Sequence, residues 1–155
     1  MDAIFSLLAL LFAAPALSVR QFPAVQPGTV ATPTSFGFDD LLQRLERAVQ
    51  ANGLMVIAKP SASRNAAGRG IQISGNAVIL AFNNDFALRL LQASVPAGFE
   101  APMRLYVTEN PDRTATVTYR TATALFAPYD TPDLAPLAGD LDQLFAKIVT
   151  EATRS

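Results

Sequence analysis

The last apolar repeat of the chain limits most strongly the folds that are open to it. Apolar residues recur there at positions i, i+3, i+4, i+7, i+8 and i+11. They are Leu141, Leu144, Phe145, Ile148, Val149 and Ala152. This spacing predicts an amphipathic helix with one continuous apolar stripe. A stripe of this kind has to be buried against a second layer, and the segments before it predict a sheet.

Two segments upstream of this helix predict a β-hairpin. The sequences MRLYVTE (103–109) and TATVTYR (114–120) alternate apolar and polar residues around the turn NPDR. The apolar positions, which we expect on one face, are Met103, Leu105, Val107, Ala115, Val117 and Tyr119. The polar positions of the other face are Arg104, Tyr106, Thr108, Thr114, Thr116, Thr118 and Arg120. The hairpin is therefore expected to have one apolar face and one polar face.

The remaining elements predict an α+β fold. FDDLLQRLERAVQANG (38–53) has helical spacing and ends in Asn-Gly, and LMVIAK (54–59) follows as a strand. A helical turn at 61–67, a strand at 77–82 and a helix of about ten residues from Phe86 come next. We expect an antiparallel sheet packed by the long C-terminal helix and by the N-terminal helix.

Two helix starts carry candidate capping residues. Asp39 or Asp40 can cap the first helix, and Asp40 with Gln43 has the spacing of a capping box. Asn84 or Asp85 is expected to cap the helix that follows residues 77–82, with Asn83 turning the chain.

The N-terminus predicts an export signal. Residues 3–17 are apolar apart from one serine, and Ala-Pro-Ala at 14–16 fits a signal-peptidase site. We expect a signal peptide at 1–18, a proline-containing linker at 19–33 and one domain at 34–155. GTVATPTSF (28–36) could close the linker with an edge strand. Cleavage after Ala16, cleavage after Ser18 and retention as a membrane anchor stay open, because the first residues lack Lys and Arg. The expected location is the bacterial periplasm or the medium, with no stable membrane span after cleavage.

The chain contains no cysteine and no histidine. Thiol catalysis, disulfide bonds and ordinary zinc sites are therefore excluded, and the usual general base near neutral pH is missing. With 12 basic and 13 acidic residues and no basic run, the chain has no electrostatic footprint for nucleic acid. Lys59, Ser61 and Ser63 do not form the S-x-x-K pattern of a Ser–Lys hydrolase. We expect no metal and no cofactor.

Five polar residues are the candidate ligand-binding set: Asn84, Asp85, Arg89, Glu100 and Arg104. The first two lie at a strand–helix junction, where backbone N–H groups could bind an anion. The others could line a groove on the polar face of the hairpin. The alternatives are a helix cap at the junction and an exposed Arg104–Glu100 ion pair that contributes little.

The order of these motifs resembles domain-of-unknown-function family 302 (DUF 302). The resemblance lies in GLMVIAKPSASRNAAGRG (53–70), in AVILAFNNDFALRLLQASVPAGFEAPMRLYVTE (77–109) and in VTYR (117–120), and it spans about 34–153. The chain departs from the family pattern at 82–85, where F-N-N-D replaces F-G-N-P. The resemblance implies a TATA-binding-protein-like, helix-grip α+β fold, and it implies no activity, so the chain looks like a divergent exported member.

Three functional hypotheses follow from these observations. The leading one is a non-enzymatic ligand-binding or protein-interaction module of the cell envelope, since the chain has a full core and no catalytic triad. The second is an enzyme that uses carboxylate and arginine groups near 83–85. The third is a homodimeric adaptor with an exposed strand and no small ligand.

Overall fold

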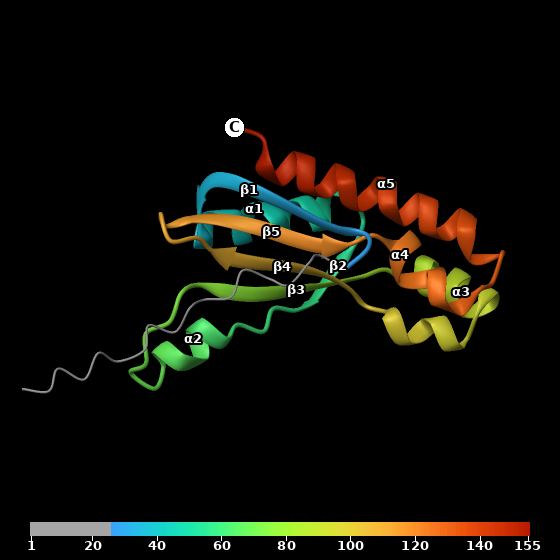
Figure 1. Cartoon of the computed structure of the whole chain (residues 1–155), viewed down its shortest axis with the longest axis horizontal. Coiled ribbons are helices and arrows are strands. Elements are labelled where there is room, and N and C mark those ends of the chain that lie inside the picture. The colour runs from blue at the N-terminus through green and yellow to red at the C-terminus, as the bar shows by residue number, and fades with distance from the viewer. Residues whose placement is uncertain (1–25) are drawn as a thin grey trace, which may run out of the picture.

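Five antiparallel strands form one sheet in the order β1-β5-β4-β3-β2 in the computed structural model, which describes residues 26–155 (Figure 1). The strands are β1 (Thr29–Gly37), β2 (Met55–Ala58), β3 (Asn76–Phe82), β4 (Met103–Glu109) and β5 (Thr114–Arg120). The predicted hairpin is confirmed as β4–β5, and it lies in the interior of the sheet. Its alternation holds, because the apolar positions are buried and the polar positions are not.

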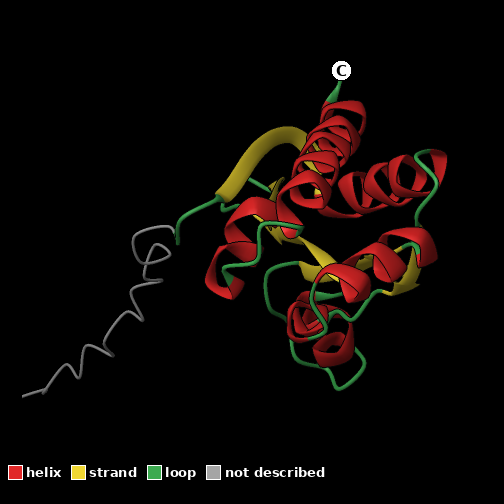
Figure 2. Cartoon of the chain, turned by 90° about the vertical axis from the view of Figure 1, so that its right-hand side faces the viewer, coloured by secondary structure: helices red, strands yellow, loops and turns green. Residues whose placement is uncertain are grey.

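Two long helices cover one face of this sheet (Figures 1 and 2). They are α1 (Phe38–Ala51) and α5 (Leu134–Thr153), and they pack against each other. Both present the apolar faces that their spacing predicts, and Phe145 and Leu41 are completely buried. The α+β class and the packing of the sheet by an N-terminal and a C-terminal helix are thus confirmed.

Five shorter helical segments connect these elements: α2 (Ala62–Ala67), α3 (Asn84–Ala93), η1 (Pro96–Glu100), α4 (Ala122–Phe126) and η2 (Ala127–Tyr129). The sequence predicted α2 and α3. It did not predict η1, α4 or η2, which are single turns too short for an apolar period to be visible.

The first strand starts inside the segment that was expected to be a linker. β1 begins at Thr29 and pairs with β5, so the sheet includes residues 29–33. The backbone passes close to α4 just before β1. Gly28 has a φ of 76°, and a Cβ atom at this position would lie 2.1 Å from the Cβ of Ala124. The expected signal peptide and the linker up to residue 25 lie outside the described residues.

The start of α1 differs from expectation. Gly37 precedes α1 without a side-chain cap, so Asp40 and Gln43 do not form a capping box. The helix begins at Phe38, which places Asp40 in its first turn, where a carboxylate still favours the helix dipole. α5 begins at Leu134, and Pro136 fits into its first turn because the first N–H groups need no intrahelical partner.

Candidate functional site

Asn83, and not Asn84 or Asp85, caps the helix at the strand–helix junction. Its side-chain oxygen accepts hydrogen bonds from the N–H groups of Asp85 (2.9 Å) and Phe86 (3.1 Å). Its amide nitrogen donates to the Gly53 carbonyl at 2.9 Å. The prediction of Asn84 or Asp85 as the cap was wrong, because a cap must be extended and Asn83 (φ −147°, ψ 133°) is the last extended residue. The N–H groups of Asp85 and Phe86, which could have bound an anion here, are therefore occupied.

Three of the five predicted site residues lie apart from the other two. Asn84 and Asp85 are exposed in the first turn of α3. Arg89, also exposed, binds Asp140 of α5 at 2.7 Å. None of these three lines the groove that contains Glu100 and Arg104, so the structure does not bring the predicted set together.

Glu100 and Arg104 lie where β4 and β5 separate. The register between these strands runs only from Glu109↔Ala115 to Tyr106↔Thr118. Beyond this pair, residues 103–105 of β4 pair only with β3, and residues 119–120 of β5 pair only with β1. In Figure 1, β5 runs on to α4, whereas β4 starts from the yellow turn η1. A gap therefore opens in the sheet at this end.

A groove of about 320 Å³ lies at this gap, and we call it the splay groove. Its lining residues are Gln26, Glu100, Pro102, Met103, Arg104, Tyr106, Thr118, Tyr119, Arg120 and Leu125. They come from β4 and β5, from η1 and the residue before β4, from α4, and from the segment before β1. A groove of this size is at the small end of the range for small-molecule sites.

Two arginines from neighbouring strands lie on the same side of this groove. Each lies two residues past the last pair, Tyr106↔Thr118, and strand alternation places both on the face that α1 and α5 do not cover. Arg104 is exposed and Arg120 is half-buried. Within residues 26–155 neither forms an ion pair, and Arg120 Nε is buried without a hydrogen-bond partner. This arrangement leaves guanidinium donors available to an anion.

Glu100 at the edge of the groove is held by a tyrosine from η2. The Tyr129 hydroxyl donates to Glu100 Oε1 at 2.9 Å. This hydrogen bond raises the pKa of Tyr129, and loss of solvent and the Glu100 charge add to the effect. In the described part of the chain Glu100 has no ion pair with Arg104, so the alternative of an Arg–Glu pair on a wet face does not hold.

Tyr119 forms part of the inner wall of the groove. Its ring lies 5.9 Å from that of Phe145 between centroids, and only 6% of the residue is exposed. Burial raises the pKa of the Tyr119 hydroxyl, and the nearby Asp142 charge contributes further. Among residues 26–155 this hydroxyl has no hydrogen-bond partner.

A small apolar recess of about 40 Å³ adjoins the groove. The two share Glu100, Pro102 and Met103. The rest of its wall is apolar apart from Asn83, and it consists of Leu54, Ala81, Phe82, Phe86, Ala87, Leu90, Ala101, Phe126, Leu141 and Phe145. Since the Asn83 side chain is already hydrogen-bonded, the recess is suited to hydrocarbon.

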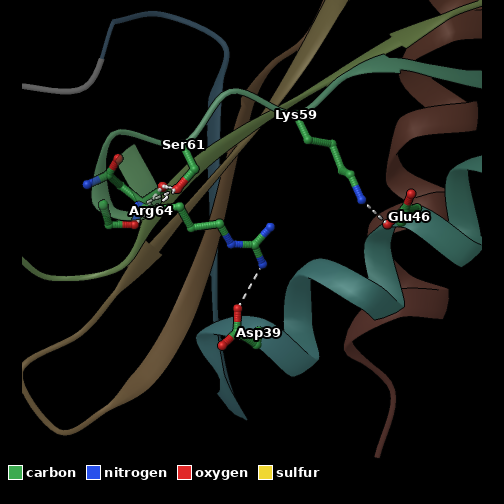
Figure 3. Close-up of polar contacts among 7 residues, drawn as sticks. Asp39, Glu46, Lys59, Ser61 and Arg64 are labelled. Atoms are coloured by element: carbon green, nitrogen blue, oxygen red, sulfur yellow. Dashed lines mark hydrogen bonds and ion pairs between the residues drawn. The ribbon is translucent and has the colours of Figure 1, made fainter. Parts of the chain in front are cut away.

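The polar cluster beside α2 is structural (Figure 3). Lys59 binds Glu46, and Arg64 binds Asp39 at 2.9 Å. Ser61 caps α2 and donates to the Asn76 carbonyl at 2.7 Å. Every one of these side chains is engaged in attaching the segment to its neighbours, which agrees with the absence of a Ser–Lys hydrolase pattern.

Sequence reasoning missed Tyr119, Arg120 and Tyr129 as site residues. For Arg120 the signal was present, because alternation already placed it on the polar face with Arg104, and the register of the hairpin would have paired them. For Tyr129 no signal existed, since η2 is a single turn that only tertiary contacts position.

No helix within residues 26–155 has both the length and the apolar character that a membrane crossing requires.

The comparisons with known proteins concern the fold and the family. No curated protein matches this chain. A crystal structure of an uncharacterized conserved DUF302 protein from Bacillus stearothermophilus is similar, with a TM-score of 0.73 and 20% sequence identity. The match covers 83% of this chain and 99% of that one, and at this identity it shows the fold alone. The family model "Domain of unknown function DUF302" matches residues 30–152. The chain therefore belongs to the DUF302 family.

Proposed function

We propose that this domain is a non-enzymatic binding module and that the splay groove holds a small anionic ligand. The observation that carries the proposal is the pair Arg104 and Arg120. They lie on the same face of the sheet where β4 and β5 separate, and neither has an ion pair in the described part of the chain. A buried guanidinium nitrogen without a partner costs free energy, and a bound anion would remove that cost.

Titration with inorganic phosphate and with acetate, followed by NMR chemical shifts, tests the proposal. We expect saturable shifts at Arg120 and Thr118 that weaken as ionic strength rises. Arg120→Ala should weaken binding at least about tenfold, because a hydrogen bond to a charged group is lost. Arg69→Ala is the matched control, since Arg69 is exposed after α2 and lies away from the groove. Equal losses in both variants would contradict a specific site.

The location in the cell envelope rests on the N-terminal sequence, and we propose it with the module. N-terminal sequencing of the protein from a periplasmic fraction tests it. A new N-terminus after Ala16 or Ser18 supports export with cleavage, whereas an intact Met1 in the cytoplasmic fraction contradicts it.

An adaptor function through self-association is the second candidate. β2 is an edge strand, and Met55 and Ile57 on it are 47% and 50% exposed. Exposed edges of this kind can pair with another copy. Light scattering over a range of concentrations tests this: a dimer that Ile57→Lys dissociates supports it, and a monomeric mass at every concentration contradicts it.

A further inference from the structure

We infer that the ligand of the splay groove is an amphiphilic monocarboxylate, with a charged head and a short apolar body. This inference rests on the proposed function, because it names the chemical class of ligand for the same groove. The argument depends on which side of the sheet each lining residue faces.

The groove has a charged outer end and an apolar inner end because strand residues alternate. Arg104 follows Met103 in β4, and Arg120 follows Tyr119 in β5, so each pair points to opposite sides of the sheet. Met103 and Tyr119 face the helix layer and are buried, whereas the arginines lie on the open face. A ligand that passes through the gap between the strands therefore meets guanidinium groups first and apolar side chains next.

The inner end continues as apolar surface. Leu125 of α4 and Pro102 complete the wall beside Met103, and the recess on the other side of Pro102 and Met103 is also apolar. An inorganic anion gains no binding free energy from this apolar surface, because it has no hydrocarbon part to remove from water. A hydrocarbon body gains free energy in proportion to the apolar area that it removes from water.

The charge of the site favours a single negative charge on the head. The groove contains two arginines and one carboxylate, Glu100, which Tyr129 holds at its edge. One monoanion therefore balances the site, whereas a multiply charged head would be repelled by Glu100. The volume of about 320 Å³ accommodates a head with a short chain or a single ring, and it excludes large cofactors.

A series of monocarboxylates tests this inference: acetate, butanoate, hexanoate and benzoate, each titrated by NMR against the whole chain. Affinity should rise about fourfold for each buried methylene from acetate to hexanoate. Benzoate distinguishes a ring from a chain, and tighter binding than acetate by either benzoate or hexanoate supports the inference. Hexanol, which lacks the charge, should bind much more weakly than hexanoate.

Leu125→Gln should weaken hexanoate binding about tenfold and leave acetate binding unchanged, because it makes the inner wall polar at similar size. Leu88→Gln, on the exposed side of α3, is the control and should change neither. If acetate and hexanoate bind equally well through Arg120, the inference fails and the anion-binding function stands. If no anion binds, or if hexanol binds as well as hexanoate, the proposed function fails as well.

Discussion

The amide of Asn83 joins three segments of the chain through a single side chain. It caps α3 with its oxygen and binds the Gly53 carbonyl, which precedes β2, with its nitrogen. The sequence predicted Asn84 or Asp85 as the cap and placed Asn83 in the turn. It could not identify Asn83 as the cap, because that depends on where β3 stops being extended, and the pairing of β3 with β2 and β4 decides this.

Asn83→Ala should lower the free energy of unfolding by about 1–2 kcal/mol, because two N–H groups and one carbonyl lose their partner. Asp85→Ala is the neighbouring control and should cost less, since Asp85 is exposed and makes no cap. Chemical denaturation of both variants measures the difference. A larger loss for Asp85→Ala would mean that the capping assignment is wrong.

Tyr129 should ionise at a higher pH than an ordinary tyrosine, because its hydroxyl donates to Glu100. Its folded pKa lies above the unfolded value of 10.0, so its contribution to stability is present below pH 10 and is lost as pH rises through the folded pKa. Glu100→Gln should lower the pKa of Tyr129 toward 10.0. NMR titration of the Tyr129 ring measures this, and Glu109→Gln, at the distant hairpin turn, should leave it unchanged.

At the scale of elements, α4 shows why short helices cannot be predicted from the sequence. Its five residues are too few for a period, and part of its N-terminal capping comes from another helix. The carboxylate of Asp142 in α5 accepts hydrogen bonds from the Ala122 N–H and, at 2.6 Å, from the Thr123 hydroxyl. By contrast, α5 and the hairpin were predictable because each one shows its own repeat in a continuous segment.

The splay groove was not predictable, because it depends on the pairing of β1 with β5, a contact between residues some ninety positions apart.

Asp142→Ala should destabilise the protein by about 1–2 kcal/mol, because the start of α4 loses its acceptor. Asp140→Ala, two residues earlier in the same helix, removes only an exposed ion pair with Arg89 and should cost at most about 0.5 kcal/mol. Thermal or chemical unfolding of the two variants gives the comparison. Equal losses would show that the cap of α4 does not contribute to stability beyond a surface pair.

At the scale of the whole molecule, one core joins the helices to the sheet. The largest fully buried side chain is Phe145 of α5, and its ring lies against Tyr119 of β5. Sequence periodicity identified both residues as core positions. It did not show that this contact lies directly behind the splay groove, because the layers come together only in the folded chain.

Phe145→Ala should lower the free energy of unfolding by about 3–5 kcal/mol, since it leaves a cavity between α5 and the sheet. Leu144→Ala, at the adjacent and only partly buried position, should cost less. The midpoint of denaturation measures both. Similar losses would mean that α5 does not pack on the sheet through Phe145.

The separation of β4 from β5 also has a consequence for motion. Some amide groups of residues 103–105 and 119–120 point into the gap, because these residues have a strand partner on one side only. They should exchange their hydrogens with solvent through small local openings, whereas residues 107–109 and 115–117, which pair across the hairpin, should be better protected. A ligand that spans the gap would connect the two parts of the sheet and slow the exchange. Hydrogen exchange can therefore reveal the ligand by its effect on a few amides before its chemistry is known.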